Sequence, residues 1–121
     1  MVLDSNIFIY SVLPQHAVLR DLIRANEPSA SIVSRVEVLG FHRLHDSERI
    51  SLEDLFTICE ILPLTKVIAD RAIVLRQTRK MGLGDALIAA TALIHSKLLV
   101  TVNAKDFQWI EGLKLLNPLA P

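Results

Sequence analysis

The chain has 121 residues, 51% of them hydrophobic, and its 13 basic and 13 acidic residues cancel. This length predicts one domain, residues 1–121, with a large aliphatic core, and the apolar surplus favours a homo-oligomer. The balanced charge excludes a protein that binds nucleic acid through a global basic field, so any such site must be local.

Cysteine content and charge distribution limit the setting of the protein. The single cysteine, Cys59, excludes an internal disulfide and lies among apolar residues at helical spacing, which favours a place in the core. No charge-free run is long enough to cross a membrane, and no basic segment precedes the apolar start. We therefore expect a cytoplasmic protein with no membrane partner.

Short apolar runs alternate with segments of helical periodicity along the chain. In chain order we predict a strand at Val2–Leu3, a short helix at Ile7–Tyr10, a helix over 17–27, a strand at Ala30–Val33, a helix at Ser34–Leu44, a helix at Ser51–Leu62, a short or edge strand at Ile61–Leu64, a helix at Lys66–Lys80, a helix at Asp85–Ser96, and strands at Leu98–Val102 and Leu113–Leu116. Strands that alternate with helices pair in parallel through right-handed crossovers. The sequence therefore predicts a small doubly wound α/β domain.

Several residues mark the ends of these elements. Pro14 ends the first helix, and Ser51 is a candidate N-cap. Ser34 precedes Glu37 by three residues, which is the spacing of a capping box. Trp109 is an apolar side chain that we expect to close over the core.

Four carboxylates follow strands or begin the helices after them. Asp4 ends the first strand, Glu37 and Asp85 fall in predicted first turns of helices, and Asp106 lies just past the strand LLVTV. In a parallel sheet these places share one edge, so the four acids should converge on one crevice. Crowded carboxylates have raised pKa values or require a cation, and oxygen ligands favour Mg²⁺ or Mn²⁺.

Each acid taken alone also has a purely structural interpretation. Asp4 could simply cap the first helix, and Glu37 could be the second half of a capping box with Ser34. Asp85 could favour a helix N-terminus, and Asp106 could be a turn residue. These interpretations stay open one by one, but they explain less well why all four acids fall on the same predicted edge.

Four strings in series, LDSNIFIY, SRVEVLGF, LGDALIAATAL and LVTVNAKDF, resemble the PIN-domain ribonucleases, in particular the VapC-type toxins of toxin–antitoxin pairs. The resemblance covers nearly the whole chain. It implies a three-layer α/β/α sandwich around a four- or five-stranded parallel sheet. It also implies that Asp4, Glu37, Asp85 and Asp106 are the catalytic, metal-binding acids.

The chain departs from the family pattern at three positions. Ser5 stands where the family usually has Thr, Val102 where it often has Arg, and Asn103 where some members carry an acid. We expect Ser5 and Asn6 to order the turn that holds Asp4, and Asn103 to bind metal through water or to orient Asp106.

The resemblance implies hydrolysis of RNA phosphodiester bonds with one or two Mg²⁺ (or Mn²⁺) ions, by the toxin of a type II pair. Its partners would be RNA, a cognate antitoxin protein and a second copy in a homodimer, with contacts from helices around Val36–Leu44 and Ser51–Leu62. Four cations near the acidic edge are candidates for RNA contact, although a solvated helix face is the other interpretation: Arg35, Arg79, Lys80 and Lys105.

Two other functions compete with this one. Haloacid-dehalogenase-like phosphatases also begin with an apolar strand ending in Asp, but their second Asp would stand where this chain has Asn6. A PIN-like scaffold could bind RNA or a partner without cutting. Four converging carboxylates argue against the scaffold, since a binder of a polyanion gains nothing from them.

Overall fold

The computed structural model describes residues 1–120 and contains a five-stranded sheet whose strands all pair in parallel. In spatial order the strands are β3 (Glu60–Leu62), β2 (Ser29–Ser31), β1 (Val2–Leu3), β4 (Leu99–Val100) and β5 (Leu115–Leu116). The chain steps from β1 outward to β3 on one side, then returns to the other side of β1 for β4 and β5. The strand order therefore reverses between β1 and β4, which is where open α/β sheets bind ligands.

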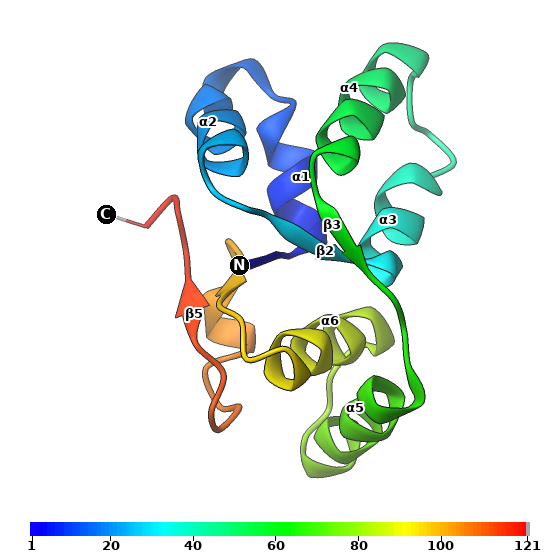
Figure 1. Cartoon of the computed structure of the whole chain (residues 1–121), viewed down its shortest axis with the longest axis vertical. Helices are drawn as coiled ribbons and strands as arrows, with labels where there is room; N and C mark the ends of the chain where they lie inside the picture. The colour runs from blue at the N-terminus through cyan, green and yellow to red at the C-terminus, as the bar shows by residue number, and fades with distance from the viewer. Residues whose placement is uncertain (121) are drawn as a thin grey trace.

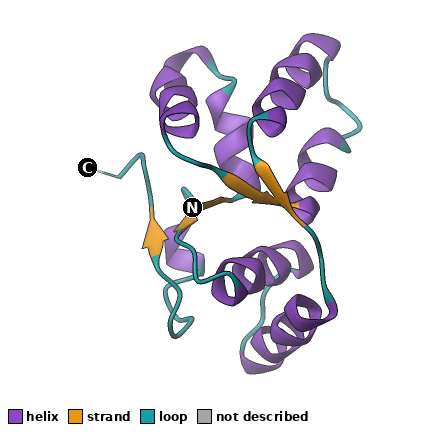
Figure 2. Ribbon diagram, viewed as in Figure 1, coloured by secondary structure: helices purple, strands orange, loops and turns teal. Residues whose placement is uncertain are grey.

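Helices cover both faces of the sheet (Figure 1). One face carries α1 (Ser5–Ser11), α2 (Ala17–Ala25), α3 (Ile32–Leu39) and α4 (Asp46–Thr57), and the other carries α5 (Lys66–Thr78) and α6 (Leu83–Ile94). Short 3₁₀ turns, η1 (Pro14–His16) and η2 (Ala104–Asp106), precede α2 and follow β4. Figure 2 shows the strands between the two helical groups, which confirms the expected three-layer α/β/α architecture. Within residues 1–120, no helix is both long and apolar enough to cross a membrane.

The central strands are apolar on both faces because both faces are covered. Val2 and Leu99 pack in the core beneath α5 and α6, whereas their neighbours Leu3 and Val100 pack in the core beneath α1–α4. All four side chains are fully buried. Adjacent residues of a strand point to opposite faces, so a sheet buried on both sides needs continuous apolar runs instead of an alternating pattern.

Cys59 is a core residue, as its apolar neighbourhood predicts. Its side chain is 9% exposed, and its thiol donates a hydrogen bond to the Leu55 carbonyl oxygen at 3.3 Å. Burial raises the pKa of the thiol to about 11, so it is not poised as a nucleophile.

The boundary between the second strand and its helix differs from the prediction. Ser31, not Ser34, is the N-cap of α3, and its Oγ accepts a hydrogen bond from the Val33 N–H at 3.0 Å. Ser34 is buried inside the helix, so the predicted capping box with Glu37 is wrong. Ser31 also pairs with β3, so the strand ends at the residue that begins the helix.

Three other helix boundaries were predicted wrongly, and one of them is the end of the helix expected to reach Leu62, which stops at Thr57 before β3. The helix α3 ends at Leu39 with Gly40 as its C-cap and does not continue to Leu44. The next helix begins at Asp46, not at Ser51, because Glu48 accepts a hydrogen bond from the His45 N–H at 3.4 Å and completes the first turn. The strand predicted around 61–64 is confirmed at the edge of the sheet, where the following Pro63 leaves no donor unpaired.

Candidate active site

Asp4 lies at the carboxyl end of β1 and is held by hydrogen bonds on both carboxylate oxygens. Its Oδ1 accepts from the Ser5 N–H at 2.8 Å, and its Oδ2 accepts from the Thr101 hydroxyl at 2.8 Å. The residue is the N-cap of α1 and is only 4% exposed. The capping interpretation is therefore correct, but a cap needs neither burial nor a second strand to hold it.

Thr101 links the ends of β1 and β4. Its hydroxyl oxygen accepts from the Asn6 side-chain amide at 3.3 Å and from the Asn103 N–H at 3.0 Å while it donates to Asp4. Asn6 in turn accepts from the Val102 N–H at 3.4 Å. Sequence reasoning missed Thr101, although a lone hydroxyl in the apolar run LLVTV was a signal.

Glu37 reaches the same region from α3. It lies in the second turn of that helix, not the first as predicted, because the helix begins at Ile32. The Ser5 hydroxyl donates a hydrogen bond to Glu37 Oε1 at 2.8 Å, so Ser5 contacts both Asp4 and Glu37. Gly84 lies against the Glu37 carboxylate, and a Cβ atom there would collide with Oε2. The absence of a side chain at position 84 therefore leaves the space that the Glu37 carboxylate occupies.

Asp85 lies in the first turn of α6, as predicted, and is partly buried. Burial raises the pKa of its carboxyl, and the negative charges of Glu37 and Asp106 raise it further. Asp106 itself ends the turn η2 after β4 and is exposed. Asp85 thus lies within the electrostatic reach of the acids from α3 and η2.

Burial also raises the pKa of Asp4, from 3.8 to about 6. The hydrogen bonds from Thr101 and Ser5 lower this pKa in part, and the charges of Asp85 and Glu37 add to the increase. The negative charge of Glu37 raises the pKa values of both Asp4 and Asp85, and the charge of Asp106 also raises that of Asp85. The charges of Asp4, Glu37 and Asp85 therefore repel one another, and Asp106 joins this group through Asp85.

The donor set of this group fits a hard divalent cation. All four side chains offer carboxylate oxygens, and each oxygen of Asp4 accepts only one hydrogen bond from the protein, which leaves lone pairs for a further ligand. In the arrangement described for residues 1–120, no three Asp, Glu, His or Cys side chains stand close enough together to hold a metal ion. A metal ion held by three of these acids would therefore require their carboxylates to come closer together.

Three of the four candidate RNA-contacting cations lie beside the acids. Arg79, Lys80 and Lys105 line a hollow of about 260 Å³ together with Asp85 and Asp106. The hollow thus combines positive charge for phosphates with two of the candidate metal ligands. The fourth candidate lies elsewhere, because Arg35 borders a separate hollow with residues of α4 and β3.

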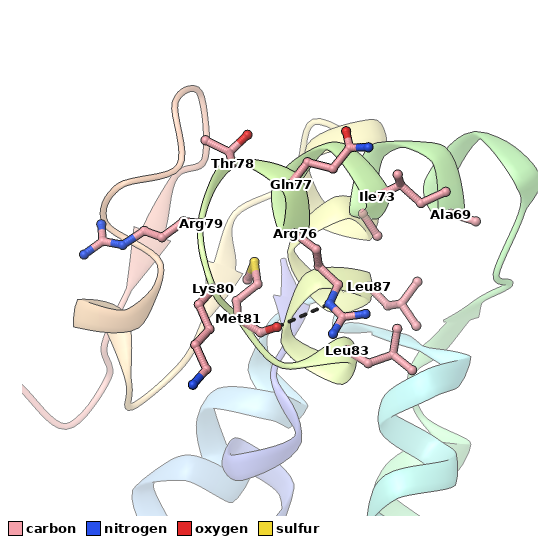
Figure 3. Close-up of a pocket in the computed structure, with 11 residues that line it drawn as sticks. Ala69, Ile73, Arg76, Gln77, Thr78, Arg79, Lys80, Met81, Leu83 and Leu87 are labelled. Atoms are coloured by element: carbon pink, nitrogen blue, oxygen red, sulfur yellow. Dashed lines mark hydrogen bonds between the residues drawn. The ribbon is translucent and has the colours of Figure 1, made fainter.

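A larger hollow of about 810 Å³ lies between α5 and α6 and is drawn in Figure 3. Arg76 donates a hydrogen bond across it to the Met81 carbonyl oxygen at 3.3 Å. No acidic side chain lines this hollow, and Arg79 and Lys80 turn away from its apolar side chains Ile73 and Leu87 (Figure 3). Volume alone therefore does not identify the active site.

A family model described as the PIN domain matches residues 1–112. The protein called Ribonuclease VapC1 of Rickettsia felis is 40% identical over 62 residues, which cover 51% of this chain and 44% of that protein. Ribonuclease VapC10 of Mycobacterium tuberculosis is 39% identical over 89 residues, which cover 69% of this chain and 65% of that protein. The matches thus span less than two thirds of the length of either relative.

Solved structures match over almost the whole chain. A chain of a toxin–antitoxin complex from Klebsiella pneumoniae superposes with a TM-score of 0.80 at 27% identity, covering 99% of this chain and 98% of that one. A chain of VapBC2 from Rickettsia felis, solved with a promoter DNA fragment, gives a TM-score of 0.78 at 23% identity with 96% of both chains covered, which supports the fold alone. With the family model matching residues 1–112 and the fold in agreement, this chain belongs to the PIN-domain family.

Proposed function

We propose that this chain is a metal-dependent endoribonuclease, a hydrolase of RNA phosphodiester bonds that acts as the toxin of a type II toxin–antitoxin pair in the cytoplasm. One observation carries the proposal: at the switch point of a PIN fold, Ser5 links the carboxylates of Asp4 and Glu37, and Asp85 lies near both Glu37 and Asp106. Relatives named ribonucleases support the reaction class. Residues 1–121 would act as one domain.

The proposed metal is Mg²⁺ or Mn²⁺, as one or two ions held by Asp4, Glu37, Asp85 and Asp106, with Asn103 contributing through water. When bound, the metal would activate water and stabilise charge on the scissile phosphate. A cation would also favour the ionised form of Asp4, whose pKa is about 6 in its absence.

The remaining residues of the site would position these groups. Thr101 and the Ser5 backbone hold the two oxygens of Asp4, and the Ser5 hydroxyl holds Glu37. Arg79, Lys80 and Lys105 would bind backbone phosphates beside the acids without reading sequence. Arg35 lies outside this hollow, so we give it no role in cleavage.

The proposed protein partner is an antitoxin whose tail lies beside Glu37. A hollow of about 260 Å³ between α1, α3 and α4 supports this, because apolar side chains including Ile9, Val38 and Leu52 line it and Glu37 stands at its border. A partner segment with apolar side chains and an Arg would bind the apolar lining of this hollow and the Glu37 carboxylate. The exposed Val36 on α3 and the exposed Ile50 on α4 are the proposed homodimer contacts.

A phosphatase of the haloacid-dehalogenase type lacks a required group here. Its acid/base would stand at Asn6, whose amide is bonded to Thr101 and to the Val102 N–H and carries no titratable proton. A cleavage assay distinguishes the ribonuclease from a scaffold that binds RNA or a partner without cutting.

The test is cleavage of RNA with unpaired segments by the purified chain, freed of any partner, in Mg²⁺, in Mn²⁺ and in EDTA. We expect cleavage with either metal and none in EDTA. Asp85→Asn should abolish cleavage, whereas Asp21→Asn, an exposed acid of α2, should leave it unchanged. Metal-independent RNA binding without cleavage would support the scaffold, and full activity of Asp85→Asn would refute the proposed site.

A further inference from the structure

Trp109 occupies the border of the hollow that holds Asp85 and Asp106. It lies three residues after the end of η2, and its indole N–H donates a hydrogen bond to the Asp106 carbonyl oxygen at 3.0 Å. The indole also packs against the buried core beneath α5 and α6. The ring is thus fixed in place beside the candidate metal ligands instead of moving freely on the surface.

One face of the indole is in contact with a flat cation. The guanidinium of Arg79 lies over this face, 5.6 Å from the ring centroid. Both residues line the hollow, and Trp109 keeps part of its surface exposed. Guanidinium groups and nucleobases stack on the same aromatic faces, so the contact identifies a surface suited to a base.

We propose that Trp109 forms a stacking subsite for a nucleobase next to the scissile phosphate. The inference rests on the proposed ribonuclease function and adds the requirement that this base be unpaired. The base would stack on the indole face, and Arg79 would move from the ring to a neighbouring phosphate.

The charges around the hollow suit this binding mode. Lys80 and Lys105 border the same space as Trp109, so a backbone bound by these cations carries its bases towards the indole. Asp85 and Asp106 border it too, which places the stacked base beside the acids. A base in a duplex is covered on both faces by its neighbours, so this subsite selects single strands.

The chain offers a direct probe, because Trp109 is its one tryptophan. A base stacked on the indole changes the fluorescence of Trp109. A strand without bases can still bind the cations through its phosphates, but it has nothing to stack on the indole. We would titrate the wild-type chain, in EDTA to prevent cleavage, with short oligoadenylate, with the abasic strand of equal length and with duplex RNA. We expect quenching by oligoadenylate and little by the other two. Oligoadenylate that binds without changing the fluorescence, or that does not bind, would overturn the inference.

Variants test the same contact by anisotropy of labelled oligoadenylate. Trp109→Leu should weaken binding by about 5- to 150-fold, the range for one lost stacking contact, and should weaken binding of the abasic strand far less. Trp109→Phe should restore most of the affinity, and Gln108→Ala, the exposed neighbour, should match wild type. Circular dichroism checks folding of each variant. If Trp109→Leu does not fold, Trp109→Phe and the wild-type comparison of oligoadenylate with the abasic strand decide.

Cleavage measured alongside separates this inference from the proposed function. If wild type cleaves RNA while Trp109→Leu binds and cleaves single strands equally well, the nuclease stands and the stacking subsite is refuted. If wild type does not cleave but oligoadenylate quenches Trp109 and the abasic strand does not, the subsite stands and the nuclease fails.

Discussion

Replacing Asp4 by asparagine should stabilise the metal-free chain at neutral pH while abolishing cleavage. The carboxylate is 4% exposed, and burial raises its pKa from 3.8 to about 6. The folded chain therefore binds this proton more tightly than the unfolded chain does. The stability that Asp4 contributes is present below pH 4 and is lost as pH rises through the interval from about 4 to about 6.

The size of the effect follows from two opposing contributions. The raised pKa corresponds to a penalty of about 3 kcal/mol for ionised Asp4 in the folded chain at pH 7. Asparagine removes that penalty and keeps an acceptor for the Ser5 N–H, but its amide would donate to Thr101, whose oxygen already accepts from Asn6 and the Asn103 N–H. That conflict costs about 1–2 kcal/mol. We expect a net gain of about 1–2 kcal/mol in the free energy of unfolding.

Urea unfolding of both chains in EDTA, at steps between pH 4 and pH 8, measures this difference. The advantage of Asp4→Asn should grow from pH 4 to about pH 6 and then stay constant. Adding Mg²⁺ at pH 7.5 should stabilise wild type, by about 2.7 kcal/mol when Mg²⁺ is 100 times its Kd, and should leave Asp4→Asn almost unchanged. Asp21→Asn, an exposed acid of α2, is the control and should follow wild type in both experiments.

Two results would refute this reasoning. A stability difference that does not depend on pH would show that ionising Asp4 carries no penalty in the folded chain. A Mg²⁺ effect of equal size in wild type and Asp4→Asn would show that the metal binds away from this carboxylate.

Three further substitutions test separate parts of the structure. Thr101→Val removes the hydroxyl that holds the buried carboxylate, so urea unfolding should show a loss of about 1–3 kcal/mol and cleavage should fall. Gly84→Ala places a methyl group against the carboxylate of Glu37. Titration calorimetry should show weaker Mg²⁺ binding, and circular dichroism should show an intact fold. Unchanged Mg²⁺ affinity would argue against Glu37 as a ligand. Phe8→Ala removes a fully buried ring whose centroid lies 4.1 Å from that of Phe56. The free energy of unfolding should fall by about 3–5 kcal/mol in urea. A decrease of less than about 1 kcal/mol would contradict the packing described.

Local signals in the sequence were reliable where one segment carries the whole pattern. The apolar pairs at Val2–Leu3 and Leu99–Val100 are buried on both faces, and this burial is what an uninterrupted apolar run reports. The alanine-rich segment that begins near Asp85 is α6, packed closely on α5. The placement of acids near strand ends and helix starts agrees with the nearness of Asp85 to Glu37 and Asp106, because parallel strands end at one edge. Their assignment as metal ligands stays a prediction.

Cap signals were ambiguous where neighbouring residues carry the same chemistry. Ser31 and Ser34 have the same side chain three residues apart, and both precede residues able to form a helix. The choice was made by pairing with β3, since Ser31 belongs to the β2–β3 ladder and ends it. A sequence pattern does not contain that ladder. The observed cap therefore lies three residues before the predicted one, and Glu37 lies in the second turn of the helix instead of the first.

Local patterns along the chain were enough to predict most of the strands and helices and a parallel sheet covered on both faces. The contacts that hold the site together depend instead on how distant segments pack. Thr101 contacts Asp4 across 97 positions of sequence because β1 and β4 are neighbours in the sheet. Trp109 meets Arg79 because the turn after β4 returns to the end of α5. Contacts between distant segments depend on strand order, and strand order follows from the packing of the whole chain.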